Sequence, residues 1–556
     1  MKNLPLGISD FETIISENLY YVDKSLFIKE LIDSWRKISL IPRPRRFGKT
    51  LNMSMLQYFF EKTEKSSAPL FKNLAVAQHP YCMEYQGQYP VIFLTFKSTD
   101  EPTWDECFNA LQEIIAEEFK RHNYLLKSTT LDAHEKKEFK EIINLSAQST
   151  AYKGSLKKLI KYLAQYHNKN VIVLIDEYDV PIQGGFGHQY YNKVIAFLKS
   201  FLGRGLKDNK LVEAGVVTGA MRVAKESIFT GLNNLRVCTI VDDDHADKFG
   251  LLEDEVHQIL EHYNLAHMKD KIRSWYNGYS SGLYTIYNPW SIINFLEKKG
   301  KFKPYWINSS SNDIIKNLIQ HSSPEVKEDF ERLLKKESVQ KAINENIVFA
   351  EIHKSPDALW NFLLFTGYLT FKNNPPIDED LQYLELMIPN AEIEGFYKTT
   401  ILGWFQQGPY SYNKMLQSLV SGDIETFSDL FTNFFLSSIS YFDVGDDEPE
   451  KFYHAFVLGM FVSLEKDYEL KSNHPSGYGR YDVSIIPRDM TKAGIIIEFK
   501  KPKKSSTETL EQVADNALQQ IEEEKYATEL KHRGISKIIK LGVAFQGKKV
   551  LVKEGK

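Results

Sequence analysis

The sequence has few cysteines and no long apolar run. Its three cysteines, Cys82, Cys107 and Cys238, lie far apart and without metal-ligand spacing, so neither a zinc site nor a disulfide framework is expected. No stretch approaches the roughly 18 apolar residues of a membrane span. The N-terminal MKNLPLGISDFETI also lacks the apolar core of a signal peptide. These absences predict a soluble protein in a reducing, cytoplasmic setting.

Strong net charge is also absent. A formal net charge of −4 over 556 residues argues against a chain that coats nucleic acid through bulk charge, although a local basic groove is compatible with it. Hydrophobic residues make up 43% and charged residues 26%, so a folded core is expected rather than disorder. The length exceeds what one core usually organises, which predicts more than one domain.

Apolar runs alternate with helical patterns in the first 240 residues. Four such runs, at 37–41, 90–96, 170–179 and 211–219, predict strands. The run NVIVLIDEYD at 170–179 is continuously apolar before it ends in acids, which indicates a strand buried on both faces of a parallel sheet. Strands that alternate with helices predict a doubly wound α/β domain over residues 1–240.

Two further regions follow. Between residues 241 and 440, apolar residues recur at helical spacing with few strand signals, which predicts a helical middle region or lid. After the acidic stretch DVGDDEPE at 443–450, the pattern predicts a helix at 452–464, two strands, a second helix and a strand. Residues 441–556 are therefore expected to form a separate compact α/β domain.

A basic turn, RPRRFGKT at 43–50, joins the first predicted strand to an amphipathic helix. A phosphate-binding loop needs converging backbone N–H groups, a lysine and a hydroxyl for Mg²⁺ at a helix N-terminus. Arg43 replaces the first glycine of the usual pattern, and the three arginines are expected to strengthen the attraction to polyphosphate. The alternative is a basic surface turn. The candidate nucleotide ligands are Arg46, Gly48, Lys49 and Thr50.

The most apolar predicted strand supplies the second half of such a site. Asp176 ends this strand, where it would bind Mg²⁺ together with Thr50, and the neighbouring Glu177 would activate water. Thr218 ends the next strand and Arg222 follows within one turn, so we expect them to contact the γ-phosphate and its water. The alternative is that these acids only meet solvent at the end of a strand. ATP and Mg²⁺ are the expected cofactors.

A second set of charged residues lies near the C-terminus. Asp482 occurs in GRYDVSIIP, and Glu498 and Lys500 occur in GIIIEFKK. A hairpin of two strands would bring Asp482 beside Glu498, and residues 498 and 500 would point to the same face. Metal-dependent phosphodiester cleavage requires carboxylates that hold the ion and a lysine that orients or activates water. The alternative is that these charges mark the solvent end of a strand.

Several motifs in order resemble those of a known family. RPRRFGKT, the upstream LPLGISDFETIISENLYYVDKS, LIDEYD and TGAMRVAKESIFTGLNNL are similar to the AAA-ATPase-like family of bacterial proteins, which often carry a C-terminal PD-(D/E)XK nuclease domain. The resemblance continues through WYNGY, YNPWS, YWINSS and LFTGYL and so covers most of the chain. In that family arginine often replaces the loop glycine. The resemblance therefore implies a nucleotide-binding domain of the phosphate-loop type.

The C-terminal pattern resembles the catalytic core of the PD-(D/E)XK superfamily, whose fold is that of restriction endonucleases. The resemblance implies that Asp482 and Glu498 bind Mg²⁺ or Mn²⁺ and that Lys500 assists water. The following helix resembles the A-x-x-Q-I-x-x-x-x-Y region of these nucleases, in which Gln520 would assist the site. One departure is Asn473, which stands where such domains often place a further glutamate.

The preferred hypothesis is an ATP-binding and ATP-hydrolysing protein whose nucleotide state gates a C-terminal nuclease. Its partner would be nucleic acid, with DNA preferred to RNA, and oligomers are compatible with the sequence. From Glu498 to Lys556 there are 13 Lys/Arg and 9 Asp/Glu, a net of +4, which is compatible with a basic surface facing nucleic acid. The alternative is a nucleotide-dependent switch, or a scaffold of the STAND type, whose nuclease-like domain binds nucleic acid or a partner without cleavage.

Overall fold

The computed structural model describes residues 2–34, 38–222, 228, 235–309, 312–320, 322–345, 356–372, 383–403, 409–439, 461, 464, 467–476, 479–502, 508–546 and 549–555. The chain forms two compact units. Unit 1 comprises Met1–Ser310 and Gln340–Ile393, and unit 2 comprises Ser311–Val339 and Glu394–Lys556. The middle region contributes to both units, so the division at residues 240 and 440 stays a prediction about domains.

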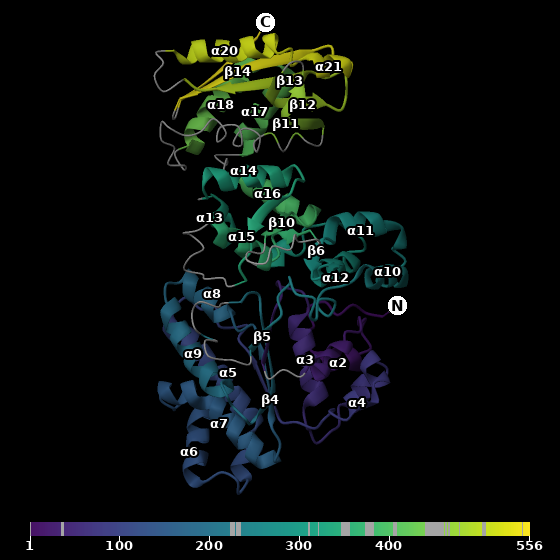
Figure 1. Ribbon diagram of the computed structural model, residues 1–556, viewed down its shortest axis with the longest axis vertical. Coiled ribbons are helices and arrows are strands. Elements are labelled where there is room, and N and C mark those ends of the chain that lie inside the picture. The colour runs from purple at the N-terminus through teal and green to yellow at the C-terminus, as the bar shows by residue number, and fades with distance from the viewer. Residues whose placement is uncertain are drawn as a thin grey trace. The chain divides into compact units, whose positions relative to one another are not determined.

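A parallel sheet forms the centre of unit 1. Its five strands lie in the order β2-β3-β4-β1-β5, and every neighbouring pair is parallel. Helices cover both faces, with α2 and α3 on one side of the strands and α5, α7 and α9 on the other (Figure 1). The strands are β1 (Ile38–Pro42), β2 (Val91–Thr95), β3 (Val171–Asp176), β4 (Val212–Gly219) and β5 (Leu235–Val237). The helices are α2 (Leu26–Asp33), α3 (Lys49–Phe60), α5 (Trp104–Arg121), α7 (Ser149–His167) and α9 (Tyr191–Leu206).

Apolar character explains the position of the strands. All residues of β1 and β3 are buried, as expected for strands covered by helices on both faces. Leu174 of β3 packs in one core with Phe59 of α3 and Phe27 of α2. The predicted doubly wound domain is confirmed for the first four strands. Strand β5 has three residues, which is too short to produce a recognisable pattern in the sequence.

The middle part of the chain is mainly helical and also holds small sheets. In unit 1 it forms α10 (Glu253–His262), α11 (Lys269–Tyr276), α12 (Pro289–Glu297) and α15 (Pro356–Phe365). Strands β6 (Tyr279–Ser281) and β7 (Tyr284–Ile286) pair antiparallel, and β8 (Val339–Ala342), β10 (Tyr383–Met387) and β9 (Thr370–Phe371) form a second small sheet. Strands of two to five residues give too little periodicity to be predicted.

A mixed sheet forms the centre of unit 2. Its strands lie in the order β11-β12-β13-β14-β15, and all neighbours are antiparallel except the parallel pair β13 and β14. The strands are β11 (Tyr468–Ser476), β12 (Gly479–Pro487), β13 (Gly494–Lys500), β14 (Ile538–Gln546) and β15 (Lys549–Glu554). The helices packed on this sheet are α17 (Pro409–Ser421), α18 (Ile424–Ile439), α20 (Leu510–Glu523) and α21 (Thr528–His532).

The alternation of side chains gives each face of this sheet its own core. Ile495 and Ile497 of β13 pack with Phe431 of α18, whereas the intervening Ile496 packs with Ile521 of α20. Residues 498 and 500 therefore share the face of Ile496, which α20 covers. Helix α20 begins with a capping box in which Thr509 and Gln512 bond each other's backbone N–H groups. The helix predicted at 452–464 lies, apart from residues 461 and 464, outside the described residues.

Helices that could span a membrane were sought in the described part of the chain. None there combines the necessary length with sufficient apolar character.

A buried carboxyl group joins three segments of unit 1. Glu392, at the start of α16 (Ala391–Gly403), is 1% exposed. It accepts hydrogen bonds from Ser291 Oγ at 2.8 Å, Trp306 N at 2.5 Å and Ile307 N at 3.2 Å. Burial raises the pKa of Glu392 from 4.5 to about 7, because hydrogen bonds from neutral donors only partly replace lost hydration. The carboxyl group thus costs stability when it is ionised.

We expect Glu392→Gln to remove a pH dependence of stability. The pKa of Glu392 is higher in the folded protein than in the unfolded protein. The stability that the protonated carboxyl group contributes is therefore complete below pH 4.5 and is lost as the pH rises to about 7. The total loss is about 3 kcal/mol. Glutamine offers an oxygen to Trp306 and Ile307 and an N–H to Ser291. The melting temperature of the Glu392→Gln protein should therefore not decline with rising pH in this way. Thermal melts from pH 5 to 8 check this, with Glu394→Gln on the same helix as control; parallel curves for Glu392→Gln and wild type would contradict it.

Candidate nucleotide site and candidate nuclease site

The turn after β1 has the backbone of a phosphate-binding loop. Gly48 precedes the first residue of α3 and has a φ of 86°, a conformation that glycine adopts without steric cost. Arg46 is also left-handed, with a φ of 67°. Lys49 is buried, and its Nζ donates to the carbonyls of Arg43 at 3.1 Å and Pro44 at 3.2 Å. The lysine therefore lies beneath the loop, at the helix N-terminus where phosphates are attracted.

One buried carboxylate joins the loop to the ends of two strands. Asp176, the last residue of β3, accepts hydrogen bonds from Thr50 Oγ1 at 2.7 Å and from Thr218 Oγ1 at 2.6 Å. Its side chain is fully buried, and burial followed by the charge of Glu177 raises its pKa. Because β4 lies between β1 and β3, these three polar groups converge at the carboxyl edge of the parallel sheet.

Glu177 lies beside the loop lysine. Its Oε1 is 3.4 Å from Lys49 Nζ, and the two residues line the same cleft. Glu177 has a φ of 55°, and a left-handed backbone at a residue other than glycine is uncommon and costs energy. The fold thus holds the carboxylate next to the lysine in a conformation that the residue itself does not favour.

The expected role of Arg43 in attracting polyphosphate is wrong. Arg43 is fully buried, and burial lowers the pKa of its guanidinium to about 10. Nη1 donates to the carbonyls of Cys238 at 2.6 Å and Pro42 at 2.9 Å, and Nη2 donates to that of Asp244 at 3.2 Å. The side chain therefore turns away from the loop opening and fixes the ends of β1 and β5. The sequence did not show that the residue after a buried strand would point inward.

The other two arginines of the loop are exposed and line an open cleft. The Arg46 guanidinium lies 4.5 Å from the ring centroid of Trp290, a cation–π contact. Arg45 donates from Nη2 to Gln183 Oε1 at 2.7 Å, and its carbonyl accepts from Trp306 Nε1 at 2.9 Å. The cleft has about 1500 Å³ of empty space, including the part open to solvent. Its walls include Lys49, Thr50, Lys97, Glu177 and Trp290.

Arg222 pairs with an acid from a distant segment. Its Nη1 lies 3.7 Å from Glu345 Oε2, and Arg222, like Asp176 and Thr218, is not among the residues that line the cleft. Burial raises the pKa of Glu345, and the charge of Arg222 opposes this shift. Contact of Arg222 with the γ-phosphate stays a prediction that requires the side chain to leave Glu345.

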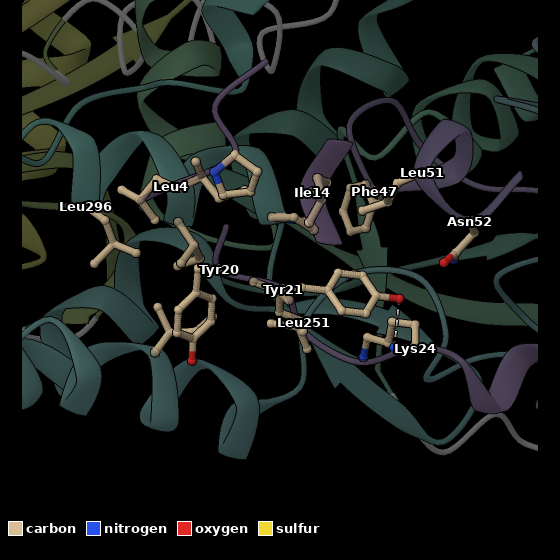
Figure 2. Close-up of a pocket in the computed structure, with 18 of the residues that line it drawn as sticks. Leu4, Ile14, Tyr20, Tyr21, Lys24, Phe47, Leu51, Asn52, Leu251 and Leu296 are labelled. Carbon is tan, nitrogen blue, oxygen red and sulfur yellow. Dashed lines mark hydrogen bonds between the residues drawn. The ribbon is translucent and has the colours of Figure 1, made fainter. Parts of the chain in front are cut away.

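An apolar pocket adjoins the cleft. It has about 680 Å³ of empty space, including the part open to solvent, and shares Gly48, Leu51 and Ile293 with the cleft wall. Figure 2 shows the pocket from within, with Ile14, Phe47 and Leu51 toward one side and Leu4 and Leu296 toward the other. Polar groups are few, with Lys24 and Asn52 at one end (Figure 2). Such a pocket suits a flat ring better than a charged group.

The C-terminal candidate residues meet on the sheet of unit 2. The β12–β13 hairpin pairs Val483 with Ile497, which brings Asp482 beside Glu498 as expected. Asp482 Oδ2 accepts from Phe499 N at 2.8 Å, and Glu498 Oε2 accepts from Asp482 N at 3.3 Å. Glu498 is buried. The two carboxylates thus bond the backbone of each other's strand at one end of the hairpin.

Helix α20 contributes an amide to this group. Gln520 Nε2 donates to Glu498 Oε1 at 2.5 Å and lies 3.0 Å from Tyr526 Oη. Lys500 Nζ donates to the carbonyl of Asn516 at 3.3 Å. Gln520 therefore contacts the predicted acid directly, whereas Lys500 bonds the backbone of the same helix.

Asn473 lies directly across the sheet from Asp482. The neighbouring pairs Ser472–Val483 and His474–Tyr481 fix this register. The residue at this register position is an asparagine, where a glutamate would add a carboxylate to the set of possible ligands. Within the described residues no group of three or more His, Cys, Asp or Glu side chains is arranged to hold a metal ion. Asp482 and Glu498 nevertheless supply the hard carboxylate oxygens that Mg²⁺ and Mn²⁺ prefer, so the residues present fit such an ion.

Asp179 and Gln183 were missed by reasoning from sequence. Asp179 is fully buried, and its carboxylate accepts from Ala220 N at 3.0 Å, Met221 N at 3.1 Å and Gln183 Nε2 at 2.8 Å. The only signal was that Asp179 is the second aspartate of LIDEYD, which resembled a family motif. Its contacts join two strand ends about forty residues apart, and spacing alone does not reveal them.

Comparisons with known proteins agree with this geometry. Residues 5–229 match the AAA-ATPase-like family, described as "Predicted AAA-ATPase", and residues 448–555 match the PD-(D/E)XK nuclease superfamily. A protein of Azotobacter chroococcum mcd 1, described as "Uncharacterized protein in vnfD 5'region", is 26% identical over 554 residues, which cover 98% of this chain and 96% of that protein. The chain thus carries a region that matches the AAA-ATPase-like family and, after it, a C-terminal region that matches the PD-(D/E)XK nuclease superfamily.

Proposed function

We propose that the protein binds and hydrolyses ATP and that its C-terminal domain is a metal-dependent nuclease. The observation that carries the proposal is the buried Asp176, which bonds Thr50 and Thr218 and lies close enough to Lys49 for the charge of the lysine to act on its pKa. A carboxylate in this place has no packing role that a smaller or apolar residue would not fill at lower cost, because burying a charge is unfavourable. Its neighbours are the groups that a nucleotide and Mg²⁺ require.

Each group around the cleft has a proposed part in nucleotide binding. Lys49 neutralises the phosphates, and the exposed Arg46 leaves Trp290 to add a second positive charge. Thr50 and Asp176 hold Mg²⁺, which when bound neutralises phosphate charge. Glu177 accepts a proton from the attacking water, and Thr218 and Arg222 act at the γ-phosphate.

The apolar pocket of Figure 2 is the proposed place for the nucleotide base. It opens beside Gly48 and Leu51, so a base there stays attached to phosphates on the loop. Apolar contact with both faces of a ring supplies affinity with little selection between bases. The few polar groups, such as Asn52, donate to a carbonyl elsewhere, in this case that of Lys248 at 2.9 Å.

Asp482, Glu498 and Lys500 are the proposed catalytic residues of the nuclease. The two acids hold Mg²⁺ or Mn²⁺, which when bound polarises the phosphodiester and lowers the pKa of water. Lys500 lies on the same face and donates to the attacking water or the developing negative charge once it leaves Asn516. Gln520 holds Glu498 in place through a 2.5 Å hydrogen bond. The substrate is nucleic acid, and DNA is preferred to RNA in this proposal.

Nucleotide occupancy is proposed to gate the nuclease. Support comes from the contacts between the phosphate loop and the middle of the chain within unit 1. Arg46 contacts Trp290, the Arg45 carbonyl accepts from Trp306, and Gly367 approaches Pro44 so closely that an added Cβ would lie 3.1 Å from it. A loop that moves on binding phosphate must therefore shift these middle segments. We also place the protein in the cytoplasm and allow for oligomers.

The test is cleavage of labelled single- and double-stranded DNA and RNA by the purified full chain, with Mg²⁺ or Mn²⁺ and with or without ATP. We expect metal-dependent cleavage of at least one DNA substrate and a rate that changes with ATP. Chelation of the metal by EDTA should abolish it. Absence of cleavage with every substrate and metal would overturn the nuclease assignment.

One observation favours a second function. Asn473 stands opposite Asp482, so the acidic ligand set is smaller than in nucleases with a further glutamate. A nucleotide-dependent switch or scaffold would bind nucleic acid or a partner through this domain without cutting it. Binding of labelled DNA without cleavage, together with an ATP-dependent change in affinity or in elution volume, would support this function.

A further inference from the structure

Asp179 clamps the backbone that follows β4. Its carboxylate accepts the N–H groups of Ala220 and Met221, and Tyr178 Oη donates to the carbonyl of Met221 at 2.8 Å. The clamp begins two residues after Thr218, which itself bonds Asp176. The turn carrying Ala220 and Met221 is thus tied to the end of β3 and not only to its own strand.

Gly219 lies against the carboxylate of Asp179, and its lack of a side chain leaves space for this contact. A Cβ at this position would lie 2.4 Å from Asp179 Oδ1 and 2.8 Å from the Tyr178 ring. Both distances are too short for a real contact, so a side chain at 219 would displace the carboxylate. Glycine is therefore the residue that this close approach requires at position 219.

A hydrogen-bond chain connects the clamp to the phosphate loop. Gln183, one turn along α8 (Val180–Gly187), donates from Nε2 to Asp179 Oδ2 at 2.8 Å. Its Oε1 accepts from Arg45 Nη2 at 2.7 Å. Arg45 is exposed and lines the cleft. The chain therefore runs from a cation in the cleft, through Gln183 and Asp179, to the turn after Thr218.

The direction of the hydrogen bonds in this chain is fixed. The guanidinium of Arg45 carries only donors, so it must bond the side-chain oxygen of Gln183, and the carboxylate of Asp179 accepts from the Gln183 N–H₂ group. Gln183 must then point its N–H₂ group to Asp179 and its oxygen to Arg45. A single amide has one orientation that satisfies both neighbours.

We propose that Asp179 and Gln183 are positioning residues for ATP hydrolysis that transmit γ-phosphate binding at Arg45 to the turn after Thr218. This inference rests on the proposed ATPase function. Arg45 shifts when it pairs with the γ-phosphate, Gln183 follows it, and Asp179 moves the turn that aligns Thr218 and carries Arg222. ADP lacks the γ-phosphate, so ADP binding does not depend on this series of hydrogen bonds.

Variants at position 183 test this proposal and leave the Asp179 side chain in place. Gln183→Leu removes both hydrogen bonds of this side chain, the one to Asp179 and the one from Arg45. Gln183→Glu keeps an acceptor for Arg45 but places a second carboxylate against Asp179 Oδ2, which now accepts from Gln183 Nε2. The double variant Arg45→Ala with Gln183→Leu tests whether the two residues act through one another, because each change alone already breaks the same series of hydrogen bonds.

The measurement is kcat for ATP with Mg²⁺ and Kd for ADP, on the full chain. Gln183→Leu and Gln183→Glu should each lower kcat about 10- to 100-fold, and the double variant should be no slower than Arg45→Ala alone. The Kd for ADP should change by less than about 3-fold in all of them. Independent structural roles would instead slow the double variant by the product of the two single effects.

The outcomes separate this inference from the function on which it rests. Wild-type turnover no higher than that of Lys49→Ala would overturn ATP hydrolysis, and the inference with it. Wild-type turnover with an unaffected Gln183→Leu, or with a double variant slowed by the product of the two single effects, would overturn the inference alone. If Gln183→Glu does not fold, Gln183→Leu decides, because it breaks the link to Arg45 and leaves Asp179 bonded to the turn; normal kcat in Gln183→Leu would contradict the inference.

Discussion

Asp482→Asn should abolish nucleic-acid cleavage while leaving the fold intact. The amide oxygen still accepts the N–H of Phe499, which Asp482 Oδ2 now does at 2.8 Å, so the hairpin keeps its hydrogen bond. The variant loses a negative charge, however, and an amide binds Mg²⁺ far more weakly than a carboxylate. We expect the rate to fall about 1000-fold or more, measured on whichever labelled DNA or RNA the wild type cleaves.

The control for this variant is Asp489→Asn in the same domain. Asp489 is exposed, and its side chain bonds only Thr491 among the described contacts, in the turn between β12 and β13. It should cleave at the wild-type rate. Both variants should bind ATP normally, because the changes lie in the C-terminal domain. Equal cleavage by wild type and Asp482→Asn would show that another site, or a contaminant, is responsible.

Lys49→Ala, unlike Asp482→Asn, should remove nucleotide binding. The buried ammonium lies 3.4 Å from Glu177 and near Asp176, so its loss leaves carboxylates facing the phosphates without a compensating cation. We expect the affinity for ATP and ADP to fall about 100-fold. Titration with a fluorescent nucleotide, or the nucleotide-induced rise in melting temperature, measures it.

Lys72→Ala serves as the matched control, because Lys72 is exposed and does not line the cleft. Its nucleotide affinity should equal that of the wild type. If nucleotide gates the nuclease, Lys49→Ala should also lose the effect of ATP on cleavage but keep the activity measured without ATP. Unchanged nucleotide affinity in Lys49→Ala would show that the loop does not bind phosphate.

Several parts of the fold and of the candidate sites followed from local pattern alone. The continuously apolar run at 170–179 predicted β3, and the order of apolar run, basic turn and amphipathic stretch predicted the loop before α3. The period of two in strands predicted that residues 498 and 500 share a face and that a hairpin brings Asp482 to Glu498. These features depend on residues close in sequence, or on a single strand pairing.

Other features of the site depend on contacts between distant segments. Arg43 faces the Cys238 and Asp244 carbonyls because β5 lies next to β1. A strand of three residues is too short for its sequence to predict this arrangement. Arg222 pairs with Glu345, more than a hundred residues away. The apolar pocket likewise combines Leu4 with Leu251 and Leu296.

By itself, the sequence determined the longer strands of the two main sheets and the helices that follow them. Periodicity and turn chemistry act over a few residues, and they placed Lys49 at the start of its helix, Asp176 at the end of its strand, and Asp482 and Glu498 within two neighbouring strands. Only the tertiary structure decided which side chains turn inward, as Arg43 does, and which strand ends meet, as Asp179 and Ala220 do. The physical reason is that hydrogen bonds and burial depend on distance in space, and separation along the chain does not specify that distance.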